Sequence, residues 1–415
     1  MNSFTLVFLT ALTAATAAKL WLAWRQLRHV RAHRAQVPDA FSDKITVAMH
    51  QRAADYTTAK TRMAMLEAVI AGVMVLAWTL GGMLGLLDRL WTATGWSTIA
   101  AGTGFLLSIF VLGTLIDLPL DAYRTFSIEK RFGFNRITSR LFVSDTVKQV
   151  ALTLVIGAPL VWLVLWLMHN SGPLWWLYVW GTWLGFSLLM LWAYPVIIAP
   201  LFNKFLPLDD AMLRSRIEAL LHRCGFASNG IFIMDGSRRS SHGNAYFTGL
   251  GENKRIVFFD TLLKALSPEE VEAVLAHELG HFKRRHVQKR LLSMAALSLL
   301  SLALLGWLSG QPWFYLGLGV ERPSLHSALA LFLLVGPVFS FFLQPLMARL
   351  MRQHEFEADD FAAEQTNAQT LVTALVKLYE ENANTLTPDP VYSAFHDSHP
   401  PAPVRVAHLL AKLHG

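Results

Sequence analysis

Two histidines and a glutamate lie close together in this 415-residue sequence, with the spacing that one metal ion needs. The segment runs His277-Glu278-Leu279-Gly280-His281. On a helix, residues four apart share a face with Cβ atoms about 6 Å apart, so both imidazoles can bind one Zn²⁺. Zinc lowers the pKa of its water toward about 7, and an adjacent glutamate can take the proton as the water attacks a carbonyl. The motif predicts a zinc site for hydrolysis.

A catalytic zinc site needs a third protein ligand, and the motif helix does not supply one in the usual way. Arg284 and Val287 stand three and six positions after the second histidine, where an extended motif would have glycine and histidine. The candidates for the third ligand are His286, His242, Glu355, Glu357, Asp359 and His399.

Two of these candidates, Glu355 and Asp359, are four residues apart and would share one face of a helix, whereas Glu357 points away from it. One acid of such a pair can bind the metal while the other accepts a hydrogen bond from a ligand histidine. The alternative is an exposed acidic helix face in which Arg352 pairs with a carboxylate.

The sequence around the motif predicts a small α+β region. A capping box, Ser267-Pro268-Glu269-Glu270, begins a helix that we expect to run through Val271–Arg285. This context disfavours the alternative of a surface helix with incidental histidines. Short strands are expected at Ile231–Asp235, Asn244–Leu250 and Arg255–Asp260, with a turn at Gly249, Gly251, Glu252 and Asn253 between the last two.

The composition shows that most of the chain does not belong to a soluble α+β domain. Hydrophobic residues make up 53% of the sequence, charged residues only 16%, and the mean hydropathy is +0.39. A soluble fold cannot hide so much apolar surface, so a cytosolic enzyme, a disordered chain and a repeat solenoid are excluded. A single cysteine also excludes a disulfide framework and a multi-thiolate metal site.

Apolar stretches long enough to cross a bilayer occur seven times. We expect a helix that continues the last of them through Arg349–Glu364. The predicted spans are Phe4–Trp24, Met65–Leu87, Ile99–Leu118, Val150–Met168, Leu174–Ile198, Leu291–Leu308 and Leu325–Met347.

The basic residues are distributed unevenly among the loops between these spans. Thirty-three lysines and arginines fall on one side and two, Arg89 and Arg322, on the other. By the positive-inside rule the N-terminus lies outside and the C-terminus in the cytoplasm. A cleaved signal peptide at 1–18 is the alternative, but no basic residue precedes the apolar run. The net charge of +7 reflects this topology, and no nucleic-acid partner is expected.

These boundaries predict four segments. Residues 1–198 carry the first five spans and 291–347 the last two, while 199–290 and 348–415 form the cytoplasmic protease region. His281 lies ten residues before one span and Glu355 eight residues after another, so both lie within about 15 Å of the lipid boundary if the helices are continuous. The expected substrate is a peptide delivered from, or tethered to, the bilayer.

The motifs together resemble the type I CAAX prenyl proteases, which are zinc metalloproteases. The resemblance covers most of the chain. The compact chain with its short outer loops favours a bacterial homologue in the inner membrane over one in the endoplasmic reticulum. Besides the seven spans and the zinc motif, the segments that carry the resemblance are Glu129–Asn135, Pro200–Phe205, Ser240–Phe247, Phe259–Leu263, Arg352–Asp360 and Ser398–Pro401 with Arg405.

The resemblance implies a mostly α membrane protein whose seven helices enclose a chamber, with a cytoplasmic α+β zincin-like (gluzincin) domain. It implies a monomer that removes the C-terminal tripeptide of lipidated CAAX proteins. The implied roles are zinc ligands for His277, His281 and Glu355, general base for Glu278, orientation of a ligand histidine for Asp359, substrate-strand pairing for Asn244 and Ala245, and carbonyl or carboxylate binding for His399 and Arg405. His286 is expected to face solvent or headgroups.

Two other functions fit parts of the sequence. The heat-shock type of membrane zinc protease shares the motif, but it typically has fewer spans and lacks the segments at 129–135 and 200–205. A transporter would use seven spans and a chamber. Coupled transport normally needs intramembrane charges, but the spans contain almost no ionisable residues, and Asp117 and Asp121 lie at a span edge.

Overall fold

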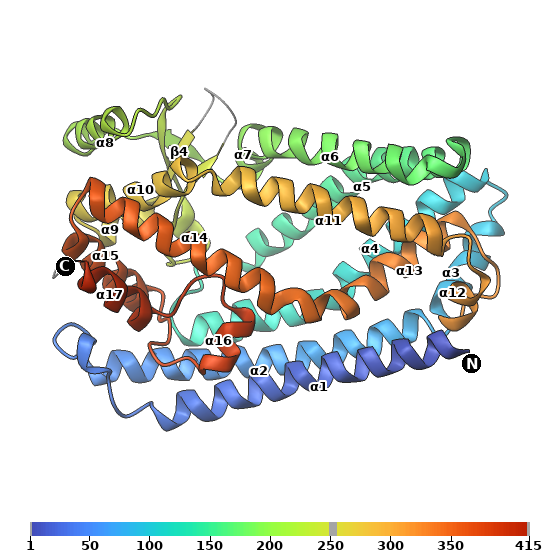
Figure 1. The fold of residues 1–415 in the computed structure, drawn as a ribbon, viewed down its shortest axis with the longest axis horizontal. Coiled ribbons are helices and arrows are strands. Elements are labelled where there is room, and N and C mark those ends of the chain that lie inside the picture. Colours follow the sequence, from blue (N-terminus) through green and yellow to red (C-terminus); the bar gives the residue numbers. More distant parts are fainter. Residues whose placement is uncertain (1, 249–254, 413–415) are drawn as a thin grey trace.

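Long apolar helices dominate the computed structural model, which describes residues 2–248 and 255–412. Among these residues seven helical runs are long and apolar enough to cross a membrane, as the sequence predicts. In Figure 1 they lie roughly parallel, with the N-terminus at one end of the bundle and the C-terminus at the other. The runs are Ser3–Ala32, Val47–Trp78, Thr98–Glu129, Ser139–Asn170, Gly172–Phe202, His286–Leu308 and Leu325–Gln365.

Several runs contain breaks or changes of helix type. Thr98–Glu129 is α4 (Thr98–Tyr123) followed by a π-helical turn at Arg124–Glu129. Gly172–Phe202 contains α6 (Trp175–Ala193) and the short α7 (Ala199–Phe202). The other spanning helices are α1 (Ser3–Ala32), α2 (Val47–Trp78), α5 (Ser139–Asn170) and α11 (His286–Leu308).

The second predicted span, Met65–Leu87, is wrong at its end. Helix α2 stops at Trp78, and a separate helix, α3 (Met83–Thr92), follows a turn. Gly82 adopts a φ of 79° in that turn, a left-handed conformation that glycine reaches without steric cost. Hydropathy alone does not reveal the break because the apolar run continues across it.

The last span carries its helix out of the bundle, as expected. Helix α13 (Leu325–Ser340) joins α14 (Gln344–Gln365) through a single 3₁₀ turn at Phe341–Leu343. Pro345 lies in the first turn of α14, where its missing N–H leaves no helical hydrogen bond unmade. The second half of α14 therefore reaches the α+β region, which consists of the sheet and the helices packed around it.

The sheet of the α+β region has four strands in the order β1-β2-β4-β3. Strands β2 (Ile231–Met234) and β4 (Arg255–Phe259) run parallel in the centre, and β3 (Ala245–Thr248) pairs antiparallel with β4 at one edge. The three predicted strands are therefore present, and β1 (Phe205–Pro207) is an addition. The predicted turn at Gly249–Asn253 lies outside the described residues.

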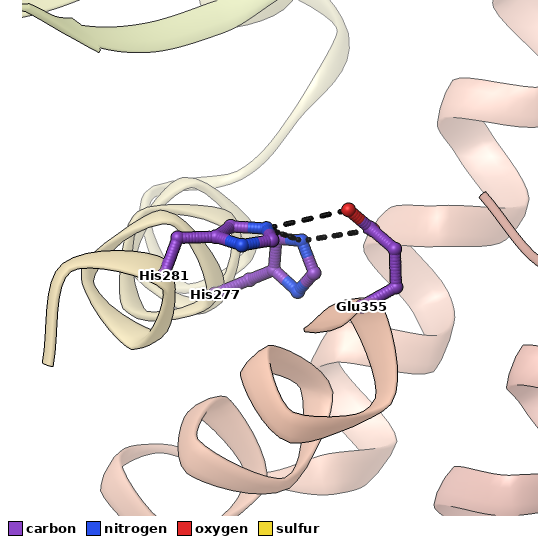
Figure 2. Close-up of side chains that lie close together, drawn as sticks. All are labelled: His277, His281 and Glu355. Carbon is purple, nitrogen blue, oxygen red and sulfur yellow. Dashed lines mark hydrogen bonds and ion pairs between the residues drawn. The ribbon is translucent and has the colours of Figure 1, made fainter. Parts of the chain in front are cut away.

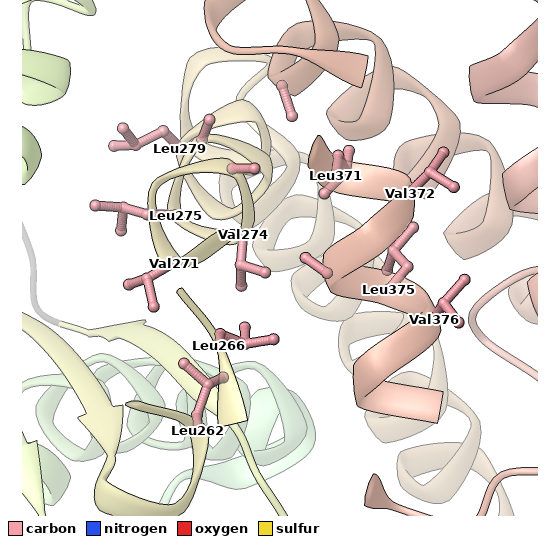
Figure 3. Packing of buried hydrophobic residues seen from close by; sticks show 14 of the residues in the cluster. Leu262, Leu266, Val271, Val274, Leu275, Leu279, Leu371, Val372, Leu375 and Val376 are labelled. Carbon is pink, nitrogen blue, oxygen red and sulfur yellow. The ribbon is translucent and has the colours of Figure 1, made fainter. Parts of the chain in front are cut away.

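A single hydrophobic core joins the sheet to the helices of this region. Leucines and valines of α10 (Pro268–Lys283) pack against α15 (Ala368–Glu381) and against Leu262 and Leu266, as Figure 3 shows. Gly280 permits a close approach of α10 to α14, because a Cβ there would lie 2.9 Å from the Cα of Ala358. The remaining helices are α8 (Ala211–Arg223), α9 (Asp260–Ala265), α12 (Pro312–Gly317), α16 (Pro390–His396) and α17 (Ala402–Ala411).

Candidate active site

Helix α10 presents the zinc motif, and its predicted start is confirmed. The Ser267 hydroxyl accepts a hydrogen bond from the backbone N–H of Glu270, whose carboxylate accepts one from the N–H of Ser267. The same carboxylate is 2.8 Å from the ammonium of Lys377 on α15. The cap and this ion pair fix the start of α10, nine residues before the first histidine of the motif at His277.

The two motif histidines face a single carboxylate from α14. The Nε2 atoms of His277 and His281 are 3.3 Å apart. The two carboxylate oxygens of Glu355 divide between them: Oε2 is 3.4 Å from Nε2 of His277, and Oε1 is 3.4 Å from Nε2 of His281 (Figure 2). One ligand atom from each residue lies within 4.8 Å of the other two. Of the six candidates for the third ligand, Glu355 is therefore the one that the fold brings to both imidazoles.

This group of donors fits a zinc ion. Glu355 is buried, and its Oε2 atom accepts no hydrogen bond from the described residues. A buried carboxylate oxygen without a donor is costly, and a cation between the three side chains would satisfy it. Two imidazole nitrogens and one carboxylate oxygen are a ligand set that zinc uses in catalytic sites.

A buried ion pair supports His277 on the side away from Glu355. Its Nδ1 is 2.8 Å from a carboxylate oxygen of Asp359, which is 0% exposed. The buried guanidinium of Arg405 donates from Nε to the other oxygen of Asp359, at 2.8 Å. Burial alone would lower the pKa of His277, but the carboxylates of Asp359 and Glu355 raise it to about 9.

A different arrangement supports His281. Its Nδ1 is 3.0 Å from Nδ1 of His286, and Nε2 of His286 is 2.9 Å from a carboxylate oxygen of Glu357. His286 is only 4% exposed, so the expectation that it faces solvent or headgroups is wrong. Glu357 does point away from the two motif histidines, as its position on α14 predicts, but it reaches His286.

A cavity of about 320 Å³ opens in front of the motif. Burial raises the pKa of the Glu278 carboxyl, which lines this cavity. Asn244 and Ala245 line it from the edge strand β3 and the residue before it, and His399 and Arg405 line it from the C-terminal part of the chain. The fold thus brings six of the sequence-predicted residues, the five named here and His277, to the lining of one space.

His399 and His242 differ in their relation to the zinc ligands. Nε2 of His399 is 3.3 Å from Glu355, while most of its imidazole is exposed. His242 lies apart, with Nδ1 3.1 Å from the amide oxygen of Asn382 and Nε2 3.5 Å from Glu129. His242 is therefore not brought to the motif.

A larger cavity of about 950 Å³ adjoins the first one. Tyr379, Asn384 and His399 line both spaces, and the larger one extends between α2 and the π-helical turn after α4. Tyr379 and Asn384 are not predictable from the sequence, because neither belongs to a motif with a recognisable spacing. The cavity in front of the motif therefore shares part of its wall with a larger cavity that is lined in part by helices of the bundle.

Two family comparisons divide the chain between them. Residues 26–204 match the N-terminal part of CAAX prenyl proteases, described as five membrane helices. Residues 207–413 match peptidase family M48.

Individual relatives agree with these matches. A CAAX prenyl protease 1 homolog from Oryza sativa subsp. japonica is 38% identical over 306 residues, which are 74% of this chain and 72% of that protein. CAAX prenyl protease 1 of Saccharomyces cerevisiae is 37% identical over 331 residues, 75% of this chain and 73% of that protein. The crystal structure of S. mikatae Ste24p superposes with a TM-score of 0.90 at 30% identity, covering 99% of both chains.

The fold and the site define an integral-membrane zinc metalloendopeptidase, with a chamber among seven helices and a zincin protease region at one end. The chain belongs to peptidase family M48, in its CAAX prenyl protease branch. The predicted family, fold class, enzyme class and zinc requirement are confirmed.

Proposed function

We propose that this protein removes the C-terminal tripeptide from isoprenylated CAAX proteins. The relatives named CAAX prenyl proteases support the substrate class. The observation that carries the proposal is the arrangement of the cavity, which places the zinc motif beside an edge strand and next to a larger space lined in part by α2 and the π-helical turn after α4. A lipid-linked peptide needs both an extended binding site and access from the bilayer.

His277, His281 and Glu355 would hold the zinc ion through their mutually facing nitrogen and oxygen atoms. When bound, zinc supplies Lewis-acid polarisation of the scissile carbonyl and makes the attacking water more acidic. Glu278 follows His277 in the motif and faces the cavity, so we assign it the proton transfer as general base.

The acid–arginine pair behind His277 has a positioning role in this proposal. Asp359 accepts a hydrogen bond from Nδ1–H of His277, which leaves Nε2 without a proton and facing the metal site. Arg405 holds Asp359 in place and is itself buried, so its Nε and Nη2 are already engaged. Binding of the substrate's carbonyl or terminal carboxylate therefore falls to the exposed imidazole of His399.

The edge strand supplies the binding site for the peptide backbone. Strand β3 pairs with β4 on one side only among the described residues, so its outer edge can add an extended peptide as a further strand. Ala245 at the start of this strand and Asn244 just before it line the cavity. A peptide on that edge would lie across Glu278.

The orientation in the membrane is part of the proposal. The bias of lysine and arginine among the loops supports an outer N-terminus and a cytoplasmic active site. The four-segment division at residues 198, 290 and 347, the monomeric state, the absence of a nucleic-acid partner and the bacterial inner membrane stay predictions. A reporter fused to the C-terminus should be active in the cytoplasm, and activity on the opposite side would reverse the orientation.

The test of function uses purified protein in liposomes with a farnesylated CAAX peptide. Mass spectrometry should show loss of the three C-terminal residues, and chelation of zinc should stop the reaction. Failure to cleave this peptide, together with zinc-dependent degradation of non-prenylated membrane proteins, would contradict the proposal and favour the heat-shock type of activity.

A further inference from the structure

The ligand histidine His281 has a neighbour that the proposed function does not use. His286 is the first residue of α11, the sixth spanning helix, and it is buried. Its Nδ1 is 3.0 Å from Nδ1 of His281, while Nε2 of His281 faces His277 and Glu355. The contact is therefore on the side of His281 that points away from the metal site.

A break in the backbone makes this contact possible. In a continuous helix, residues five apart are rotated by about 140° and do not meet. Helix α10 ends at Lys283 and α11 begins at His286, with Arg285 at φ 59° and ψ 30° between them. This left-handed residue is uncommon for a non-glycine side chain, and it redirects the chain so that His286 lies beside His281.

The hydrogen-bonding capacity of the three side chains allows one consistent assignment of neutral tautomers. His281 must leave Nε2 without a proton if that atom binds zinc, so its Nδ1 carries the proton and donates. Nδ1 of His286 must then accept, which puts the proton of His286 on Nε2. That N–H points to the carboxylate of Glu357 at 2.9 Å, an acceptor that ionised Glu357 provides.

Two further contacts hold His286 in this orientation. Its ring stacks on His354 with centroids 4.1 Å apart and planes 13° apart. Glu357 is also 3.7 Å from the ammonium of Lys289, one turn into α11. The glutamate side chain is 44% exposed, so the chain of contacts runs from the surface of the protein to a zinc ligand.

We propose that His286 is a positioning residue that holds His281 in its metal-binding tautomer and ring orientation, with Glu357 as its anchor. The inference rests on the proposed zinc site. Zinc-bound histidines almost always donate their second N–H to an outer acceptor, and loss of that acceptor typically weakens metal binding by about 10- to 100-fold. Here the acceptor is another imidazole, supplied by a membrane-spanning helix.

Two substitutions separate positioning from packing. His286→Asn keeps an oxygen acceptor at the place of Nδ1 but has less volume, whereas His286→Leu keeps most of the volume and has no acceptor. If the role is positioning, zinc affinity measured by competition with a chelator should fall about 10- to 100-fold in the leucine variant and less in the asparagine variant. Packing alone predicts the opposite order.

A spectroscopic readout is independent of turnover. Cobalt substituted for zinc in the purified protein should give a visible spectrum that changes in His286→Leu and stays close to that of the wild type in His286→Asn. The control is His408→Ala. Nε2 of His408 is 2.6 Å from a carboxylate oxygen of Asp360, so this variant also breaks a histidine–carboxylate pair, but one that contacts none of the zinc ligands. Its zinc affinity and cobalt spectrum should match those of the wild type.

If the His286→Leu variant does not fold, Glu357→Ala still distinguishes a positioning role of His286 from a packing role. This carboxylate is partly exposed and contributes little packing, so positioning predicts a loss of zinc affinity of about threefold to tenfold and packing predicts none. Wild-type zinc affinity in a folded His286→Leu protein, or in Glu357→Ala, would overturn the inference. Failure of the proposed zinc site itself is a separate result, in which Glu355→Ala also binds zinc normally.

Discussion

The two histidine ligands of the site are supported in contrasting ways. Behind His277, Asp359 and Arg405 form a pair with exposed fractions of 0% and 5%. Behind His281, the buried His286 leads to Glu357, whose side chain is 44% exposed. The first support is an ion pair closed off from solvent, and the second is a set of hydrogen bonds that ends at the surface. Both set a tautomer, but only the first also carries a large electrostatic cost when it is broken.

The largest expected effect is on turnover and comes from Glu278, which lies between the two ligand histidines in the sequence. Glu278→Gln should lower kcat by about 100- to 10,000-fold, because the amide cannot take a proton from water. Zinc affinity should stay at the wild-type value, since neither support is touched. Turnover is measured with the farnesylated peptide and zinc binding by chelator competition. Wild-type kcat in this variant would show that another group is the base.

Asp359→Ala should be the most damaging change in the first support. It leaves the buried guanidinium of Arg405 without its main carboxylate partner, which costs about 3–5 kcal/mol of folding stability. Zinc affinity should fall as well, because His277 loses the acceptor at Nδ1. Thermal unfolding with and without zinc measures both effects, and Asp360→Ala on the same helix is the control. If Asp359→Ala lowers zinc affinity less than Glu357→Ala does, the support behind His281 is the more important of the two.

The substitution Gly280→Ala should push apart α10 and α14, the two helices that carry the zinc ligands. In Gly280→Ala the new methyl group would lie 2.9 Å from Cα and 3.0 Å from the carbonyl oxygen of Ala358. Relieving that overlap should cost about 1–3 kcal/mol and shift Glu355 away from the histidines. Gly336→Ala is the matched control, because a Cβ there meets nothing within 4 Å. Equal stability and zinc affinity in both variants would mean that α14 adapts freely.

The smallest expected effect lies far from both supports. Ser267→Ala removes the N-cap of α10 and should cost about 1 kcal/mol of folding stability. The motif lies nine residues along the helix, so zinc affinity should not change. Chemical unfolding measures the first quantity and chelator competition the second. A large loss of zinc affinity would show that the helix start, and not the supports, determines the ligand geometry.

The sequence predicts those parts of the molecule that local patterns determine. Apolar length gives the seven spans, and the capping box gives the start of α10. The i,i+4 spacing of Glu355 and Asp359 places both acids on one face, which the fold turns toward His277. In each case one short segment carries the whole signal, so no knowledge of tertiary packing is needed.

Features that depend on distant contacts or on single backbone angles are not predictable in this way. The end of α2 depends on the left-handed Gly82, within an otherwise apolar run. The position of His286 depends on the left-handed Arg285, which no propensity favours. Strand β1 has only three residues, one of which is a proline, and it becomes a strand through its pairing with β2.

The most direct test of the account is the zinc content of Glu355→Ala. Elemental mass spectrometry of purified, dialysed protein should find about one zinc per chain in the wild type and in Glu364→Ala, an exposed position on the same helix. The Glu355→Ala protein should contain far less zinc. A full complement of zinc in that variant would contradict the three-residue site on which the proposed chemistry depends.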